Sequence, residues 1–296
     1  MTGSFVQDTR AMMPDRLLPA VAAAALFMTG CAGANPLSAQ QSAPTSVGAQ
    51  PTYVDLVELA DNTPLVLHAQ VRDQAEVEPE RAPGLAPGHA RLFVEADTLA
   101  LIAGSVPVGQ SLRYLVDVPL DARGKVPKLK KQQVILFAQP VPGRPGELQL
   151  VDPGAQSPWG AELEARLRPI LASLIVPDAP PVVTGIRDAL AVEGNLTDES
   201  ETQIFLETAR GDPVSLSVVR RPGMEPRWGV SWSELVDQSA RPVRPGTLEW
   251  YRLACTLPER LPPEANLARE ARARSLAVSD YAFVIERLGP CTRNRG

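Results

Sequence analysis

The chain has 296 residues, of which 44% are hydrophobic and 21% charged, so it has enough apolar residues for one or two buried cores. Its formal net charge of −5 has the wrong sign for binding nucleic-acid phosphates, and we expect no nucleic-acid partner. The 30 prolines favour many short elements separated by turns.

An apolar run from Leu17 to Met28 follows Arg16 and precedes small residues. It is shorter than the about 20 residues that a membrane-spanning helix needs. The order positive, apolar, small is that of a secretory signal. We therefore expect residues 1–30 to be a signal peptide. We also expect the true start of translation to be Met12 or Met13.

The segment Met28-Thr29-Gly30-Cys31 resembles the lipobox of bacterial lipoproteins. The resemblance implies that Cys31 is lipidated, becomes the new N-terminus and anchors the chain at the periplasmic face of the cell envelope. Residues 31–52 are rich in Ala, Pro, Ser and Gln, which is typical of a flexible tether. The rest of the mature chain resembles no particular family.

Two alternatives to the anchor stay open. Cleavage after Ala34 or Ala39 would give a soluble secreted or periplasmic protein. The apolar run could instead be an N-terminal helix that stays with the fold.

Residues 53–155 have the period-two apolar pattern of strands, broken by Gly and Pro. The opening segment Tyr53–Asp61 could be a short helix or strand. The segment at 91–104 changes phase near Asp97, as a bulged strand would. Strands are expected at 64–72, 91–104, 111–118, 133–138 and 147–151. This number of strands predicts a small barrel or curled sheet, which is similar to OB-type barrels in strand count and spacing only.

A connecting helix and a Pro-rich linker are expected over 156–181. Leu163, Leu167, Ile170 and Leu174 follow helical spacing, and Pro169 should kink or break the helix. The prolines from Pro177 to Pro181 should form a stiff linker.

Residues 182–296 are expected to form an antiparallel meander covered by C-terminal helices. The three predicted strands lie at 201–208, 213–221 and 227–235, and share one apolar face that must be covered. Thr247 and Ser279 are the predicted helix N-caps, and Gly289 is a predicted C-cap. The fold class is therefore α+β, mostly β.

The three cysteines are Cys31, Cys255 and Cys291. If Cys31 carries lipid, an even pair remains, which can form a disulfide in an oxidising compartment. We expect a Cys255–Cys291 bridge with Cα atoms about 4.4 to 6.8 Å apart, the alternative being two separate thiols.

Motifs for chemistry are missing from the sequence. It has no P-loop, Gly-x-Ser-x-Gly, His-Glu-x-x-His or Cys-x-x-Cys, and only His68 and His89 as histidines. We therefore predict no catalytic residue, metal ligand or cofactor. Two charged clusters are interpreted as solvated turns: the acidic one with Asp198, Glu199 and Glu201, and the basic one with Lys125, Lys128, Lys130 and Lys131.

Trp228 and Trp232 lie four apart on a predicted strand and face the same way. Under a helical cover they are core; if exposed, they form a partner surface with Arg220, Arg221 and Arg227.

These patterns favour a non-catalytic binding or interaction protein of the envelope, not an enzyme. Its partner would be an envelope protein or a glycan, and its membrane contact the lipid anchor only. The alternative is a carboxylate-dependent hydrolase of envelope glycans, because two suitably spaced acids suffice for that chemistry.

Overall fold

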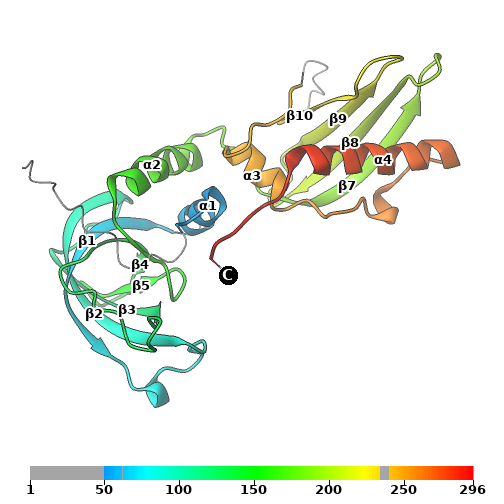
Figure 1. The fold of residues 1–296 in the computed structure, drawn as a ribbon. Helices are drawn as coiled ribbons and strands as arrows, with labels where there is room; N and C mark the ends of the chain where they lie inside the picture. Colours follow the sequence, from blue (N-terminus) through cyan, green and yellow to red (C-terminus); the bar gives the residue numbers. More distant parts are fainter. Residues whose placement is uncertain (1–49, 62, 234–239, 296) are drawn as a thin grey trace, which may run out of the picture. The chain divides into compact units, whose positions relative to one another are not determined.

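The computed structural model describes residues 50–61, 63–233 and 240–295, and residues 48–296 form one compact unit. The predicted signal, Cys31 and nearly all of the tether lie outside the described residues. The fold is α+β and mostly β, as predicted, with two antiparallel sheets (Figure 1). No helix in the described part of the chain is both long and apolar enough to cross a bilayer.

The first sheet has the order β3-β2-β1-β4-β5, and β6 also pairs with β4. Its strands are β1 (Leu65–Glu76), β2 (His89–Ala103), β3 (Ser111–Pro119), β4 (Gln133–Pro140), β5 (Leu148–Leu150) and β6 (Gln156–Pro158). Helix α1 (Tyr53–Asp61) precedes it, and a 3₁₀ turn, η1 (Pro79–Arg81), lies between β1 and β2.

This sheet is strongly curled. The amide of Arg113 in β3 donates to the carbonyl of Gly146, and Arg113 forms an isolated bridge with Glu147 beside β5. No continuous ladder closes the sheet among the described strands. Of the two architectures that the sequence left open, the structure therefore has the curled sheet and not the barrel.

Strand β4 is an interior strand, paired with β1 on one side and with the short β5 and β6 on the other. It is buried on both faces, as its uninterrupted apolar run predicts. Ile135 and Phe137 share a core with Leu167 and Ile170 of α2 (Ala161–Ile175). Helix α2 continues on both sides of Pro169, so the chain does not take the break, one of the two predicted effects of this proline. Burial of the apolar side chains of α2 compensates for the backbone hydrogen bond that Pro169 cannot donate.

The predicted phase change in the second strand is also present. Ala69 pairs with Thr98 and His68 with Ala100, so Leu99 is an extra residue in β2. Such a β-bulge reverses the side-chain alternation beyond it, which is what the sequence showed near Asp97.

The second sheet has four strands in the order β10-β9-β8-β7, one more than predicted. They are β7 (Val183–Glu193), β8 (Ser200–Thr208), β9 (Val214–Arg220) and β10 (Arg227–Ser231). The unpredicted strand is β7, whose register with β8 shifts twice, leaving Thr184 and Arg187 as extra residues. These shifts disturb the period-two pattern and hide the strand from sequence analysis.

Helices α3 (Leu248–Ala254) and α4 (Ala271–Leu288) follow, with a short 3₁₀ turn, η2 (Pro263–Ala265), between them. Figure 1 shows α4 lying along one face of the sheet. The caps at Thr247 and Gly289 are confirmed: the Thr247 hydroxyl accepts the amide of Trp250, and Gly289 has a φ of 72°.

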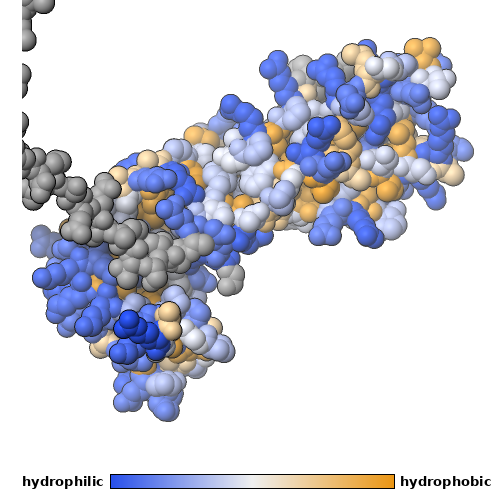
Figure 2. All heavy atoms as spheres, in the orientation of Figure 1, coloured by the Kyte–Doolittle hydropathy of each residue, from blue (hydrophilic) through white to orange (hydrophobic). Residues whose placement is uncertain are grey.

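The prediction of Ser279 as an N-cap is wrong, because α4 begins at Ala271 and Ser279 lies inside it. The residues before Ser279 are mostly Ala and Arg, good helix formers, and Ala273 and Ala277 are buried. Figure 2 shows the surface around the second sheet and α4, where most visible residues are hydrophilic and apolar ones lie between them.

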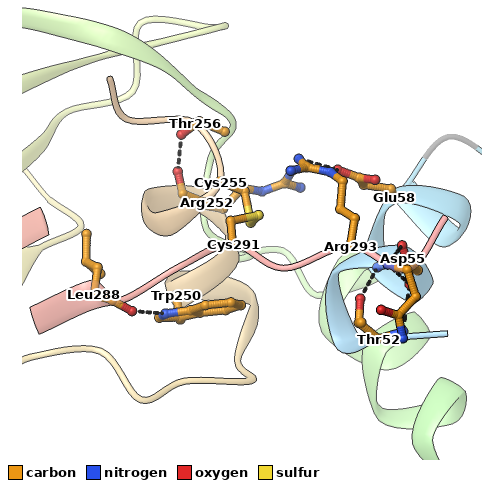
Figure 3. Close-up of a disulfide and its surroundings, with 11 residues drawn as sticks. Thr52, Asp55, Glu58, Trp250, Arg252, Cys255, Thr256, Leu288, Cys291 and Arg293 are labelled. Atoms are coloured by element: carbon orange, nitrogen blue, oxygen red, sulfur yellow. Dashed lines mark hydrogen bonds and ion pairs between the residues drawn. A yellow bond between two sulfur atoms is a disulfide. The ribbon is translucent and has the colours of Figure 1, made fainter. Parts of the chain in front are cut away.

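The last described residues, 291–295, run back to α1, and we call them the C-terminal clasp. The clasp begins at a disulfide between Cys255 and Cys291, whose Cα atoms are 5.1 Å apart, within the expected range (Figure 3). Next along the chain, Arg293 donates to the carboxylate of Glu58 in α1, with an Nε–Oε1 distance of 2.8 Å.

The clasp binds mainly to Asp55 of α1 (Figure 3). Its buried carboxylate accepts the backbone amides of Asn294 and Arg295, at 3.0 and 3.1 Å, and that of Thr52 at 2.7 Å. In the same region Arg252 of α3 makes two hydrogen bonds to Asp61 at the end of α1. These contacts join α1 to the C-terminal part of the chain.

Candidate functional site: the open face of the second sheet

The two faces of the second sheet have different surroundings. One face carries Ile204, Leu216 and Trp228 and shares a core with residues of α4, such as Val284. We call the opposite face the open face. The strand register places these residues on it: Leu190, Val192, Gln203, Phe205, Ser217 and Val219.

Two aliphatic side chains of the open face remain in solvent. Leu190 is 44% and Val192 59% exposed, although both lie in the regular part of β7. They line a hollow of about 530 Å³, together with Gln203, Val219 and Arg221. Covering them would remove apolar surface from water, which favours association with a partner.

Gln203 lies in the middle of this face, paired with Leu190 on one side and Ser217 on the other. Its side-chain amide donates to Glu201 at 2.6 Å, while its carbonyl oxygen is buried and has no hydrogen-bond partner among the described residues. A buried acceptor without a donor costs about 1–3 kcal/mol. Rotation of the Gln203 side chain would bring this oxygen to the surface of the hollow, where a hydrogen bond donated by a ligand would recover that cost.

The carboxylates that line the hollow already have partners. Glu193 forms an ion pair with Arg272 at 3.2 Å, and Glu199 accepts the amide of Leu196 at 3.3 Å. Glu201 accepts from Gln203. By contrast, Arg221 and Arg227 are exposed and form no ion pair within the described ranges. The rim of the open face therefore offers exposed positive charge.

The structure brings together only some of the residues that the sequence predicted to form a partner surface. Trp228 is 7% exposed and lies in the core under α4, and Trp232 is partly buried against the same core. The two tryptophans thus form no exposed patch, because the C-terminal helices cover their face. Arg227 pairs with Val219 in the strand register, which puts it at the rim of the open face.

Arg220, also predicted for that surface, has a structural partner instead. It donates from Nε to Asp280 at 2.6 Å, and the hydroxyl of Thr202 donates to the other oxygen of the same carboxylate. Asp280 is completely buried. This buried pair fixes α4 on the sheet.

A second hollow, of about 540 Å³, lies between α1, α2 and the start of α3. Its apolar walls include Leu56, Ile170 and Leu248, which are already buried. Burial, reinforced by Glu249, raises the pKa of Tyr53 to about 12, so its hydroxyl stays neutral. Val176 also lines this hollow and is 44% exposed. We take the open face as the candidate site because it exposes two side chains of one strand, Leu190 and Val192, side by side.

The two histidines are far from the open face in sequence and have local roles. His68 stacks on Trp159 with ring centroids 4.5 Å apart, and its Nε2 lies 2.9 Å from Gln133 Oε1. His89 lies at the exposed start of β2. In the part of the chain that the structure describes, no group of three His, Cys, Asp or Glu side chains could hold a metal ion.

Sequence analysis missed the open face because it missed β7. The alternation of Ala189 and Ala191 with Leu190 and Val192, just before Gly194-Asn195, was a usable strand signal. No protein-family model matches the chain, and no curated protein matches it either.

Proposed function

We propose that this chain is a lipid-anchored protein of the bacterial cell envelope that works as a non-catalytic binding module, with the open face as its binding surface. The observation that carries the binding role is the hollow itself, where exposed Leu190 and Val192 lie beside the unpaired acceptor of Gln203. The lipobox-like segment before Cys31 supports the location.

The chemistry of this face favours an envelope protein over a glycan. Sugar rings bind best on exposed aromatic faces, but the Phe205 ring has the Arg187 guanidinium 5.4 Å from its centroid. Aliphatic side chains, a hydrogen-bond acceptor and the exposed Arg221 and Arg227 suit a protein segment with apolar and acidic side chains. Its backbone amides would supply the donor that Gln203 lacks.

Site-specific photo-crosslinking in cells tests the binding surface. A crosslinker at Val192 should capture one protein, and Leu190→Asp should abolish that adduct, because a carboxylate cannot be buried in an apolar contact. The matched control is a crosslinker at Val278, which is 51% exposed on α4. The same adducts from both positions, or an adduct that survives Leu190→Asp, would contradict the proposal.

The anchor is tested separately with a clickable fatty acid. The wild-type chain should be labelled and recovered with membranes, whereas Cys31→Ala should be unlabelled and soluble. A labelled, membrane-bound Cys31→Ala chain would show that the lipid is attached elsewhere.

The glycan hydrolase remains the competing function, because Glu193, Glu199 and Glu201 line one hollow. Purified wild-type protein and Glu201→Gln should both leave envelope glycan intact. Release of soluble fragments by the wild type, and its loss in Glu201→Gln, would replace the binding function with catalysis.

A further inference from the structure

All four lysines of the chain lie between Lys125 and Lys131. Arg123 lies just before them, so residues 122–132 hold five cations and no acid. We call this segment, which joins β3 to β4, the basic loop. The five cationic side chains belong to exposed residues: Arg123, Lys125, Lys128, Lys130 and Lys131.

The backbone of the basic loop is held in one shape from several sides. The Asp121 side chain accepts the amides of Arg123 and Lys125, at 2.8 and 2.9 Å. The side chain of Gln74 in β1 accepts the amide of Leu129 and donates to the carbonyl of Pro127. Leu129 is buried in the first core. The loop is thus fixed to the sheet while its cations point outward, and docking would cost it little backbone entropy.

Few of these charges are neutralised within the chain. Lys130 pairs with Asp73 at 3.3 Å, and both side chains are mostly exposed, so the pair is weak. The other four cations form no ion pair among the described residues. Elsewhere the chain uses arginine for close pairing, as in the two hydrogen bonds from Arg91 to Asp117. Lysine is a hydrated point charge, which suits attraction to a diffuse anionic surface better than a paired site.

We propose that the basic loop docks on the anionic phospholipid headgroups of the membrane in which the chain is anchored. This inference rests on the proposed anchor. The sequence predicted that the chain touches the membrane only through the lipid on Cys31, and the basic loop would be a second point of contact. Residues 32–49 could extend by about 60 Å at most, which lets the folded part reach the surface. The absence of aromatic side chains in the loop argues against single-stranded nucleic acid as the ligand.

Vesicle co-sedimentation of the chain from residue 31 onward, carrying Cys31→Ala, tests the loop without lipid. This chain contains the whole compact unit of residues 48–296. Vesicles of phosphatidylcholine alone are compared with vesicles that also contain phosphatidylglycerol. We expect binding to the anionic vesicles only. Replacing all four lysines with glutamine (K125Q, K128Q, K130Q, K131Q) should weaken it on the order of 100-fold, and added salt should weaken it too.

The matched control removes four exposed arginines elsewhere (R81Q, R144Q, R210Q, R269Q), and circular dichroism checks that both variants fold. The control variant should still bind. Equal binding by the wild type and the lysine variant, or equal binding to neutral vesicles, would overturn the proposal. So would binding of the loop to a soluble anionic polysaccharide but not to vesicles. The tested chain carries no lipid, so its binding to vesicles does not depend on the anchor. The fatty-acid labelling of the wild type tests the anchor separately.

Discussion

Asp280 carries its carboxylate in the middle of the contact between α4 and the second sheet, where it has no exposure to water. The Arg220 guanidinium and the Thr202 hydroxyl compensate for that burial. Asp280→Ala should therefore lower the free energy of unfolding by about 2–4 kcal/mol, because it leaves Arg220 with an unpaired, partly buried charge. Urea denaturation measures this.

The control for Asp280 is Glu286→Ala, at an exposed position of the same helix, which should change stability by less than about 0.5 kcal/mol. Equal effects of the two substitutions would mean that the buried pair does not hold α4 in place.

Asp55 gives the clasp a pH dependence. Burial alone would raise its pKa, but the amides of Thr52, Asn294 and Arg295 and the Thr52 hydroxyl outweigh burial and hold the pKa below its ordinary value of 3.8. A carboxyl group with a lowered pKa stabilises the fold above its unfolded pKa, and this contribution is lost as the pH falls through the folded pKa. The wild type should lose stability from about pH 4 downward.

Asp55→Asn should destabilise the protein at pH 6, and the difference from the wild type should shrink at pH 3. Urea midpoints at both pH values measure it. Asp178→Asn is a suitable comparison because Asp178 is exposed and is not a partner of the clasp. A difference for Asp55→Asn that stays constant across this range would contradict the assigned hydrogen bonds.

At the scale of elements, the disulfide joins the end of α3 to the start of the clasp. In the chain-entropy model, closing a loop of this length contributes about 4 kcal/mol. We expect Cys255→Ser with Cys291→Ser to lower the unfolding free energy by a few kcal/mol, and dithiothreitol to do the same to the wild type only. A variant as stable as the oxidised wild type would contradict this.

Several elements could be predicted from local patterns. The buried run of β4, the bulge in β2 and the cap at Thr247 each depend on a few neighbouring residues, and the structure has all three. Strand β7 was missed because its extra residues at Thr184 and Arg187 break the alternation. The candidate site was missed with it, since Leu190 and Val192 belong to that strand.

At the scale of the whole molecule, limited proteolysis should cut first in the tether, because residues 48–296 form one compact unit. A stable fragment beginning near Gln50 is expected. The next cut should fall near Pro177, which is exposed, as the sequence-based domain boundaries also require. Intact mass spectrometry of the fragments measures this, and resistance at both places would argue against these boundaries.

The contact between α1 and the C-terminus could not be predicted from the sequence. Asp55 and its partners Asn294 and Arg295 are separated by 239 and 240 residues. The sequence near Asp55 shows only the local capping box that it forms with Thr52. It gives no sign of the two further amide donors, because these come from the backbone of a distant segment. Such pairings depend on tertiary structure alone.

The clasp also has a consequence for the order in which the protein is made. Asp55 leaves the ribosome 239 residues before Asn294 and 240 before Arg295, whose amides donate to its carboxylate. Until these two residues are synthesised, α1 therefore carries a carboxylate without two of its donors. A chain truncated before Asn294 would still contain every strand and both cysteines of the disulfide, but it could not supply these two donors. The clasp thus makes a chain with residues 294–295 distinguishable, in stability, from one that lacks them.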